Sequence, residues 1–165
     1  MGTPRLTIRE ARPAEFEAIG RLAVAAYRSL GPIPEPYEDE LLQTALRAAA
    51  VPVLVAVDED GALLGTVTYV PGPGTPYSEH ERDDEAGMRV LAVAPSALGR
   101  GIGRALAEAV LARARDTGRG GVALYTRPSM TAAHQLYASL GFRRVPDADW
   151  QFEPGEWLWG YRLRF

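Results

Sequence analysis

The sequence predicts an α/β (α+β) fold, because two kinds of hydrophobic periodicity alternate along a chain of 165 residues. Short, mostly apolar runs, such as residues 88–94, are typical of buried strands. Apolar residues recur at helical spacing in other segments, most clearly from Ile102 to Val110. Residues 157–165 instead alternate with a period of two, which is typical of a strand with one buried face.

The same patterns predict the element order β-α-α-β-β-β-α-β-α-β-β. A first strand is expected from Leu6 to Glu10, and Pro13 suits the first turn of a helix that ends near Leu30. A second helix from about Tyr37 to Ala50 is expected to point its apolar residues inward, namely Leu41, Leu42, Ala45 and Leu46. The further elements are a hairpin of strands 53–57 and 63–70, a strand at 88–94, a helix from 102 to about 117, a strand at 121–126, a helix that ends at Leu140 and the terminal strand 157–165.

The composition favours a single domain over residues 1–165, since 47% of the residues are hydrophobic and a chain of this length buries a substantial core. Cysteine is absent and only His80 and His134 are present, so a zinc site or a Ser-His-Asp triad has little to draw on and we expect no metal. A net charge of −3 without a dense basic stripe argues against nucleic acid as a partner. Because no apolar leader or bilayer-spanning run is present, we expect a cytoplasmic protein that binds no membrane.

The loop between the strand at 88–94 and the helix from 102 is suited to hold an anion. It alternates glycines with two arginines in the order Leu98-Gly99-Arg100-Gly101-Ile102-Gly103-Arg104. Glycines let a ligand approach the backbone closely, and the N–H groups of the first helical turn have no partners within the helix. Arg100 and Arg104 can add charge-assisted hydrogen bonds. This combination predicts a phosphate-binding loop.

Spacing excludes two families of nucleotide-binding loops. The dinucleotide fingerprint G-x-G-x-x-G fails in both frames, because its last position falls on Arg104 or on Leu106. A P-loop requires Gly-Lys-Ser/Thr, and the chain contains no lysine.

The remaining pattern resembles the acetyl-CoA loop of the GCN5-related N-acetyltransferase (GNAT) family, Arg/Gln-x-x-Gly-x-Gly/Ala, with Leu98 at the first position. A second stretch, Leu136-Tyr137-Ala138-Ser139-Leu140-Gly141-Phe142, is similar to a helix end in this family. The resemblance covers nearly the whole chain and implies the GNAT acyl-CoA N-acyltransferase fold, a twisted mixed β-sheet flanked by helices. It also implies an enzyme that transfers the acetyl group of acetyl-CoA directly to a primary amine of a small molecule or peptide.

For acetyl-CoA, the resemblance implies a pantetheine arm that pairs with the backbone of the central strand and a pyrophosphate held by the loop. The residues assigned to the cofactor in this way are Leu91, Ala92, Val93, Leu98, Gly99, Arg100, Gly101, Ile102, Gly103, Arg104, Met130 and Ala133. A backbone N–H near Val93 would stabilise the oxyanion of the reaction. Met130 stands where many relatives have asparagine and cannot donate the same hydrogen bond.

Tyr137 matches the tyrosine that assists the departing sulfur in the resembled family. Complete proton transfer from a tyrosine of pKa about 10 to a thiolate of pKa about 8.5 is uphill by roughly 2 kcal/mol. We therefore expect Tyr137 to donate a hydrogen bond rather than a proton. The alternative is that Tyr137 is an ordinary core residue on the apolar face of its helix.

The acceptor amine must lose a proton, since an alkylamine of pKa about 10.4 is almost fully charged at neutral pH. Many relatives carry a glutamate in the central strand, but the matching position here is Gly87. The candidate base is therefore Glu85 in the acidic segment 78–85, with His80 as a second titratable group. A solvated charged loop is the alternative interpretation of this segment.

The acceptor pocket is expected between the first two helices, the loop 71–77 and the C-terminal strands. Candidate lining residues are Tyr27, Tyr37, Tyr77 and Trp159. Because Leu98, Gly87 and Met130 depart from the family pattern, a non-catalytic acyl-CoA-binding or regulatory module is the alternative to an enzyme. The expected partners are acetyl-CoA and an amine acceptor, and the sequence is also compatible with a homodimer.

Overall fold

The computed structural model describes residues 5–165, and within this range eight strands form a mixed sheet. The sheet has the order β1-β2-β3-β4-β5-β8-β6, and β7 pairs with β8 outside this path. The strands are β1 (Thr7–Glu10), β2 (Val53–Val57), β3 (Leu63–Val70), β4 (Glu85–Val93), β5 (Gly121–Thr126), β6 (Arg143–Arg144), β7 (Trp150–Glu153) and β8 (Glu156–Arg164). Neighbouring strands are antiparallel, except that β4 and β5 run parallel.

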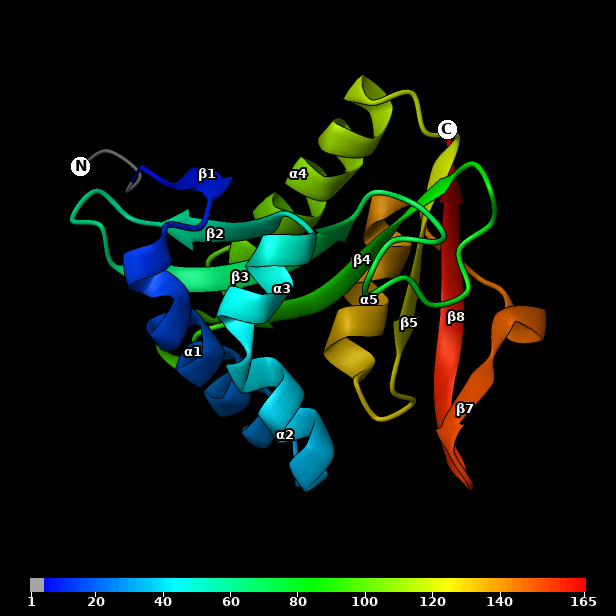
Figure 1. The fold of residues 1–165 in the computed structure, drawn as a ribbon, viewed down its shortest axis with the longest axis horizontal. Coiled ribbons are helices and arrows are strands. Elements are labelled where there is room, and N and C mark those ends of the chain that lie inside the picture. The colour runs from blue at the N-terminus through cyan, green and yellow to red at the C-terminus, as the bar shows by residue number, and fades with distance from the viewer. Residues whose placement is uncertain (1–4) are drawn as a thin grey trace.

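Helices cover both faces of the sheet (Figure 1). One face carries α1 (Phe16–Arg28), α2 (Glu35–Leu42) and α3 (Thr44–Ala50), and the other carries α4 (Ile102–Asp116) and α5 (Thr131–Leu140). Short 3-10 turns lie at Pro13–Glu15, Pro95–Ala97 and Pro146–Ala148. Along residues 5–165 no helix combines the length and the apolarity needed to cross a membrane.

Two core regions hold these layers together. The helices α4 and α5 pack on the sheet through a large cluster of buried side chains that includes Leu106, Val110 and Leu124. On the opposite face α1 contributes Ile19 and Ala23, which lie one helical turn apart and therefore share one side of the helix. The predicted mixed sheet flanked by helices is confirmed.

The strands β4 and β5 separate soon after they pair. Their parallel pairing covers only Glu85–Met88 and Gly121–Leu124. Beyond this point β4 continues along β3, whereas β5 continues along β8, and the two diverge in Figure 1. In the diverging part of β4 the register with β3 shifts, and Val90 adopts a φ of +53°. This β-bulge bends the strand away from its neighbour, so a slot opens between β4 and β5.

The structure divides the predicted helix 37–50 into α2 and α3. The break lies at Gln43, whose φ and ψ of −87° and 50° are not helical. The break changes the face that the following residues present, so the predicted inward orientation is wrong for Leu42 and Leu46, which are 46% and 61% exposed. Ala45 is exposed as well, and Thr44 and Arg47 are buried instead.

The C-terminal strand lies where it was predicted, but the large residues at its two ends, Trp157 and Phe165, are exposed. Three strands rather than two follow α5, because the short β6 and β7 both pair with β8. The strand β4 begins three residues before the predicted start at Met88. Its first residue, Glu85, is polar and is buried in an ion pair with Arg162. Apolar periodicity does not detect such a residue.

Candidate active site

A groove of about 360 Å³ follows the outer end of β4 and the loop before α4. We call it the loop groove. Almost all residues assigned to the cofactor line it, namely Leu91, Ala92, Val93, Leu98, Gly99, Gly101, Ile102, Gly103, Arg104, Met130 and Ala133. The exception is Arg100, which is exposed and lies outside the lining of the groove.

Two glycines shape the loop at the start of α4. Gly99 and Gly101 have φ values of +79° and +75°, which residues with a Cβ rarely adopt. Gly101 is the N-cap of α4, and no side chain of the described residues caps this end. The N–H groups of the first turn are therefore left to bind an anion at the positive end of the helix dipole.

Arg104 has partners within the protein. Its Nε lies 3.1 Å from a carboxylate oxygen of Glu108, and its Nη1 donates to the hydroxyl of Ser139 at 2.9 Å. These contacts direct the guanidinium along α4 and toward α5. Backbone N–H groups are thus the main anion-binding groups that the loop itself offers.

A second cavity of about 210 Å³ lies in the slot between β4 and β5. We call it the aromatic pocket, and its ring-bearing lining residues are Tyr27, Tyr37, Tyr125, Tyr137, Trp150 and Phe152. Tyr27, Leu91 and Met130 line both cavities, so the loop groove and the aromatic pocket meet at the bulge of β4.

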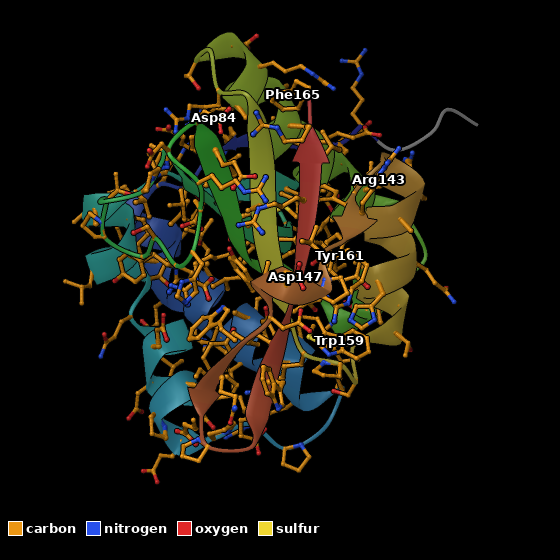
Figure 2. All side chains as sticks on the ribbon, turned by 90° about the vertical axis from the view of Figure 1, so that its right-hand side faces the viewer. Asp84, Arg143, Asp147, Trp159, Tyr161 and Phe165 are labelled. Atoms are coloured by element: carbon orange, nitrogen blue, oxygen red, sulfur yellow. The ribbon has the colours of Figure 1, made fainter. Side chains whose placement is uncertain are left out.

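Two of the four residues expected in the acceptor pocket line the aromatic pocket, and two do not. Tyr27 and Tyr37 face one another edge-on, with ring centroids 5.6 Å apart. Trp159 lies on the α5 side of β8, where its ring stacks on that of His134 (Figure 2). Tyr77 lies near Arg89 but outside the lining of the pocket. The expectations for Trp159 and Tyr77 are therefore wrong.

Tyr137 comes from α5 and faces the aromatic pocket. Its ring packs edge-on against Phe142 and also contacts Tyr161, which fixes its orientation. Burial raises the pKa of Tyr137 well above its ordinary value, so the phenol keeps its proton at neutral pH. The side chain is thus a hydrogen-bond donor in the wall of the aromatic pocket.

Two carboxylates line the aromatic pocket, and sequence reasoning missed both as site residues. Oε1 of Glu79 lies 3.0 Å from Nε of Arg89 on β4, and Oε1 of Glu40 lies 3.2 Å from Nη2 of the same arginine. Burial raises the pKa of Glu79 to about 7, although the nearby charge of Arg89 acts in the opposite direction. Glu79 belongs to the acidic segment 78–85, from which the sequence analysis chose Glu85.

Glu85 lies at the closed end of β4 and not in either cavity. The side chain is completely buried, and both carboxylate oxygens accept from Nε of Arg162 at 3.1 Å. The backbone N–H of Arg82 also donates to Glu85, at 2.7 Å. The alternative of a solvated charged loop is wrong for Glu85, and its placement favours a structural role over that of a base.

A side chain at position 87 would displace the carboxylate of Glu81. A Cβ there would lie 2.5 Å from Oε1 of Glu81 and 3.2 Å from the Cβ of Val70. The other oxygen of Glu81 accepts the backbone N–H of Glu79 at 2.7 Å. Glu81 therefore fills the space beside the central strand and anchors Glu79 at the pocket.

The remaining titratable residues do not suggest a metal centre. Among residues 5–165 no group of three or more histidine, aspartate or glutamate side chains is arranged to hold a metal ion. His80 is exposed, and its ring packs against Trp150 with centroids 4.7 Å apart.

We predict that Glu85→Ala lowers the free energy of unfolding by about 3–5 kcal/mol, because it leaves the buried charge of Arg162 without its partner. Chemical denaturation measures this change. Asp84→Ala is the matched control, since Asp84 is exposed and pairs with Arg164 at the surface, near the C-terminal end of β8 in Figure 2. It should change stability far less. Equal effects of the two substitutions would contradict the structural role of Glu85.

Comparisons with known proteins bear on the site as a whole. The acetyltransferase (GNAT) family model matches residues 16–142. A mycothiol acetyltransferase of Cellulomonas flavigena is 40% identical over 89 residues, which are 53% of this chain and 26% of that protein. The chain thus spans less than a third of the length of such curated relatives.

Solved structures match over a larger part of the chain. A GCN5-related N-acetyltransferase from Kribbella flavida superposes with a TM-score of 0.71 and 25% identity, covering 97% of this chain and 98% of that one. A GNAT family acetyltransferase from Brucella melitensis, solved in complex with acetyl-CoA, gives a TM-score of 0.65 and 25% identity over 98% and 88% of the two chains. Since the family model covers most of the sequence and the fold matches along nearly all of it, the chain belongs to the acetyltransferase (GNAT) family.

Proposed function

We propose that this chain transfers the acetyl group of acetyl-CoA to the amine of a small molecule. The observation that carries this proposal is that the loop groove meets the aromatic pocket, whose wall includes Tyr137. The aromatic pocket, at about 210 Å³, is smaller than the roughly 300 Å³ at the lower end of drug-sized sites. Its size favours a small acceptor, or the end of a longer one.

The loop groove suits an extended donor such as acetyl-CoA. Beyond Met88 the edge of β4 that faces β5 has no strand partner, so its backbone groups can pair with the amide groups of a pantetheine arm. The N–H groups at the start of α4 are placed to receive the pyrophosphate. The same groove is continuous with the aromatic pocket, which would receive the thioester end.

Glu79 is proposed as the base that removes the proton of the acceptor ammonium, directly or through one water molecule. A carboxylate of pKa about 7 can hold that proton better than an ordinary glutamate, whose pKa is near 4.3. The neutral amine then attacks the carbonyl carbon, and a new C–N bond replaces the C–S bond. The proton of the ammonium resides on Glu79 or leaves to solvent, and the second proton, which the nitrogen loses as the amide forms, passes to the thiolate or to solvent.

A backbone N–H and Tyr137 are proposed to stabilise the two negative charges of this reaction, one on the carbonyl oxygen and one on the departing sulfur. At the bulge, Val90 and Leu91 together oppose the single residue Val67 of β3, so the ladder is interrupted there. A backbone N–H released from the ladder at this point can donate to the carbonyl oxygen as it becomes negative. Tyr137 donates its hydrogen bond to the departing thiolate.

A thiol-release assay with acetyl-CoA across a panel of amines tests the proposed function, preceded by calorimetry of acetyl-CoA binding. Turnover of at least one amine supports an enzyme. Binding without turnover of any amine would favour the acyl-CoA-binding module, and an absence of binding to acetyl-CoA or longer acyl-CoA would reject both functions.

For Tyr137→Phe we expect kcat to fall by about 100-fold while the Kd of acetyl-CoA stays the same, because only the hydrogen bond to the leaving group is lost. Steady-state kinetics and calorimetry measure the two quantities. Tyr161→Phe is the control, since Tyr161 packs on Tyr137 but lines neither cavity. An unchanged kcat in Tyr137→Phe, with chemistry shown to limit the rate, would remove Tyr137 from the mechanism.

The base role of Glu79 predicts that kcat/KM rises with pH through about 7, as the carboxylate loses its proton, and then levels off. Glu79→Gln should lower the rate and abolish this inflection. Glu40→Gln should keep it but move it to lower pH, because the negative charge of Glu40 helps to raise the pKa of Glu79. Amines of different pKa separate the titration of the substrate from that of the enzyme. An inflection that survives in Glu79→Gln would assign the base elsewhere.

A further inference from the structure

The charged side chains that line the aromatic pocket are unevenly paired. Arg89 contacts both carboxylates, Glu79 and Glu40, so this group of three carries one net negative charge when both are ionised. Arg127 lines the same pocket from the end of β5. Among residues 5–165, its guanidinium forms no ion pair or hydrogen bond. The pocket is therefore anionic beside β4 and cationic at Arg127.

The backbone around Arg127 is fixed. Its carbonyl accepts the N–H of Met130 at 3.1 Å and a ring N–H of His134 at 3.0 Å. These two bonds tie the connection between β5 and α5 to the first turns of the helix. The position of Arg127 in the wall is consequently set by the fold.

The guanidinium of Arg127 is held over aromatic rings and not by anions. Its Cζ lies 5.3 Å from the ring centroid of Tyr37 and 5.8 Å from that of Phe152. Such cation–π contacts position the charge, but they do not use the five N–H donors that lie in the plane of the group. A planar oxyanion such as a carboxylate satisfies two of these donors at once.

The two carboxylates in the pocket restrict the type of anion that can bind to Arg127. Glu79 and Glu40 line the same small cavity, so a dianion such as a phosphate would meet stronger repulsion than a carboxylate. The amine of the acceptor has the opposite preference, because a positive group is stabilised beside Glu79 and Glu40. One ligand that meets both requirements is a zwitterion.

We infer that the acceptor is a small amine that carries a carboxylate, as an amino acid does, and that Arg127 binds this carboxylate while the amine faces Glu79. This inference rests on the proposed function, since it names the class of amine that receives the acetyl group. Arg127 is then a specificity-determining residue that orients the acceptor in the pocket.

The test compares amino acids with their carboxamides as acceptors in the thiol-release assay, at saturating acetyl-CoA. The wild-type protein should prefer the acid to its amide by about 10- to 100-fold in kcat/KM, which is the effect of losing a hydrogen-bonded charge. Arg127→Gln should raise KM for the acid by a similar factor, change kcat little and remove the preference. Arg127→Lys should restore part of it, because the charge returns without the planar fork.

Arg143→Gln is the matched control, since Arg143 is exposed on β6 at the outer side of the sheet (Figure 2) and lines neither cavity. Its substrate preference should equal that of the wild type. If amides and simple amines are acetylated as efficiently as the acids by the wild-type protein, the inference is overturned while acetyl transfer stands. If no amine of any class is acetylated, the proposed function itself fails. The comparison of acid and amide needs only the wild-type protein, so it holds even if Arg127→Gln does not fold.

Discussion

The separation of β4 and β5 is the constraint on which the rest of the site depends. The two strands pair over only four residues each, and the bulge at Val90 then turns β4 away. The closed end must resist this separation. There Glu85 and Arg162 form a buried ion pair across the paired segment, and Arg162 also donates to the carbonyl of His80. The buried ion pair holds the strands together at one end. The slot can therefore stay open at the other end, where the loop groove and the aromatic pocket meet.

The segment between β3 and β4 uses its acidic residues for different purposes. Glu85 is paired with Arg162 at the closed end, Glu81 fills the space beside Gly87, and Glu79 lines the open pocket. Their physical difference lies in their partners. Both oxygens of Glu85 accept from Nε of Arg162, whereas Glu79 shares Arg89 with Glu40 and is desolvated, which raises the pKa of Glu79. Composition alone treats these residues alike, and only the fold distinguishes the carboxylate that is paired in the core from the one that is desolvated in the pocket.

Sequence reasoning succeeded where the chemistry is local. The loop from Leu98 to Arg104 offers the N–H groups of its own backbone, so its spacing was sufficient to predict the groove. Arg100 lies outside the lining of the groove, because the direction of a side chain within a loop is not set by spacing. The charged residues of the aromatic pocket were not predicted, because Glu79, Arg89 and Arg127 come from three separate elements and are brought together only by the order of the strands in the sheet. The helix break at Gln43 was missed for a related reason: apolar periodicity continues across it, while Thr44 and Arg47 take the buried positions.

The expected position of a base on the central strand and the observed place of Glu79 are linked by packing. A glutamate at position 87 would need the space that Glu81 occupies, so the two arrangements exclude one another. With glycine at 87, the loop can approach β4 closely enough for Glu81 to accept the N–H of Glu79. This bond fixes the backbone from which Glu79 extends toward Arg89. The pocket carboxylate Glu79 thus extends from the loop and not from the strand, and the absence of a side chain at Gly87 is part of what allows this arrangement.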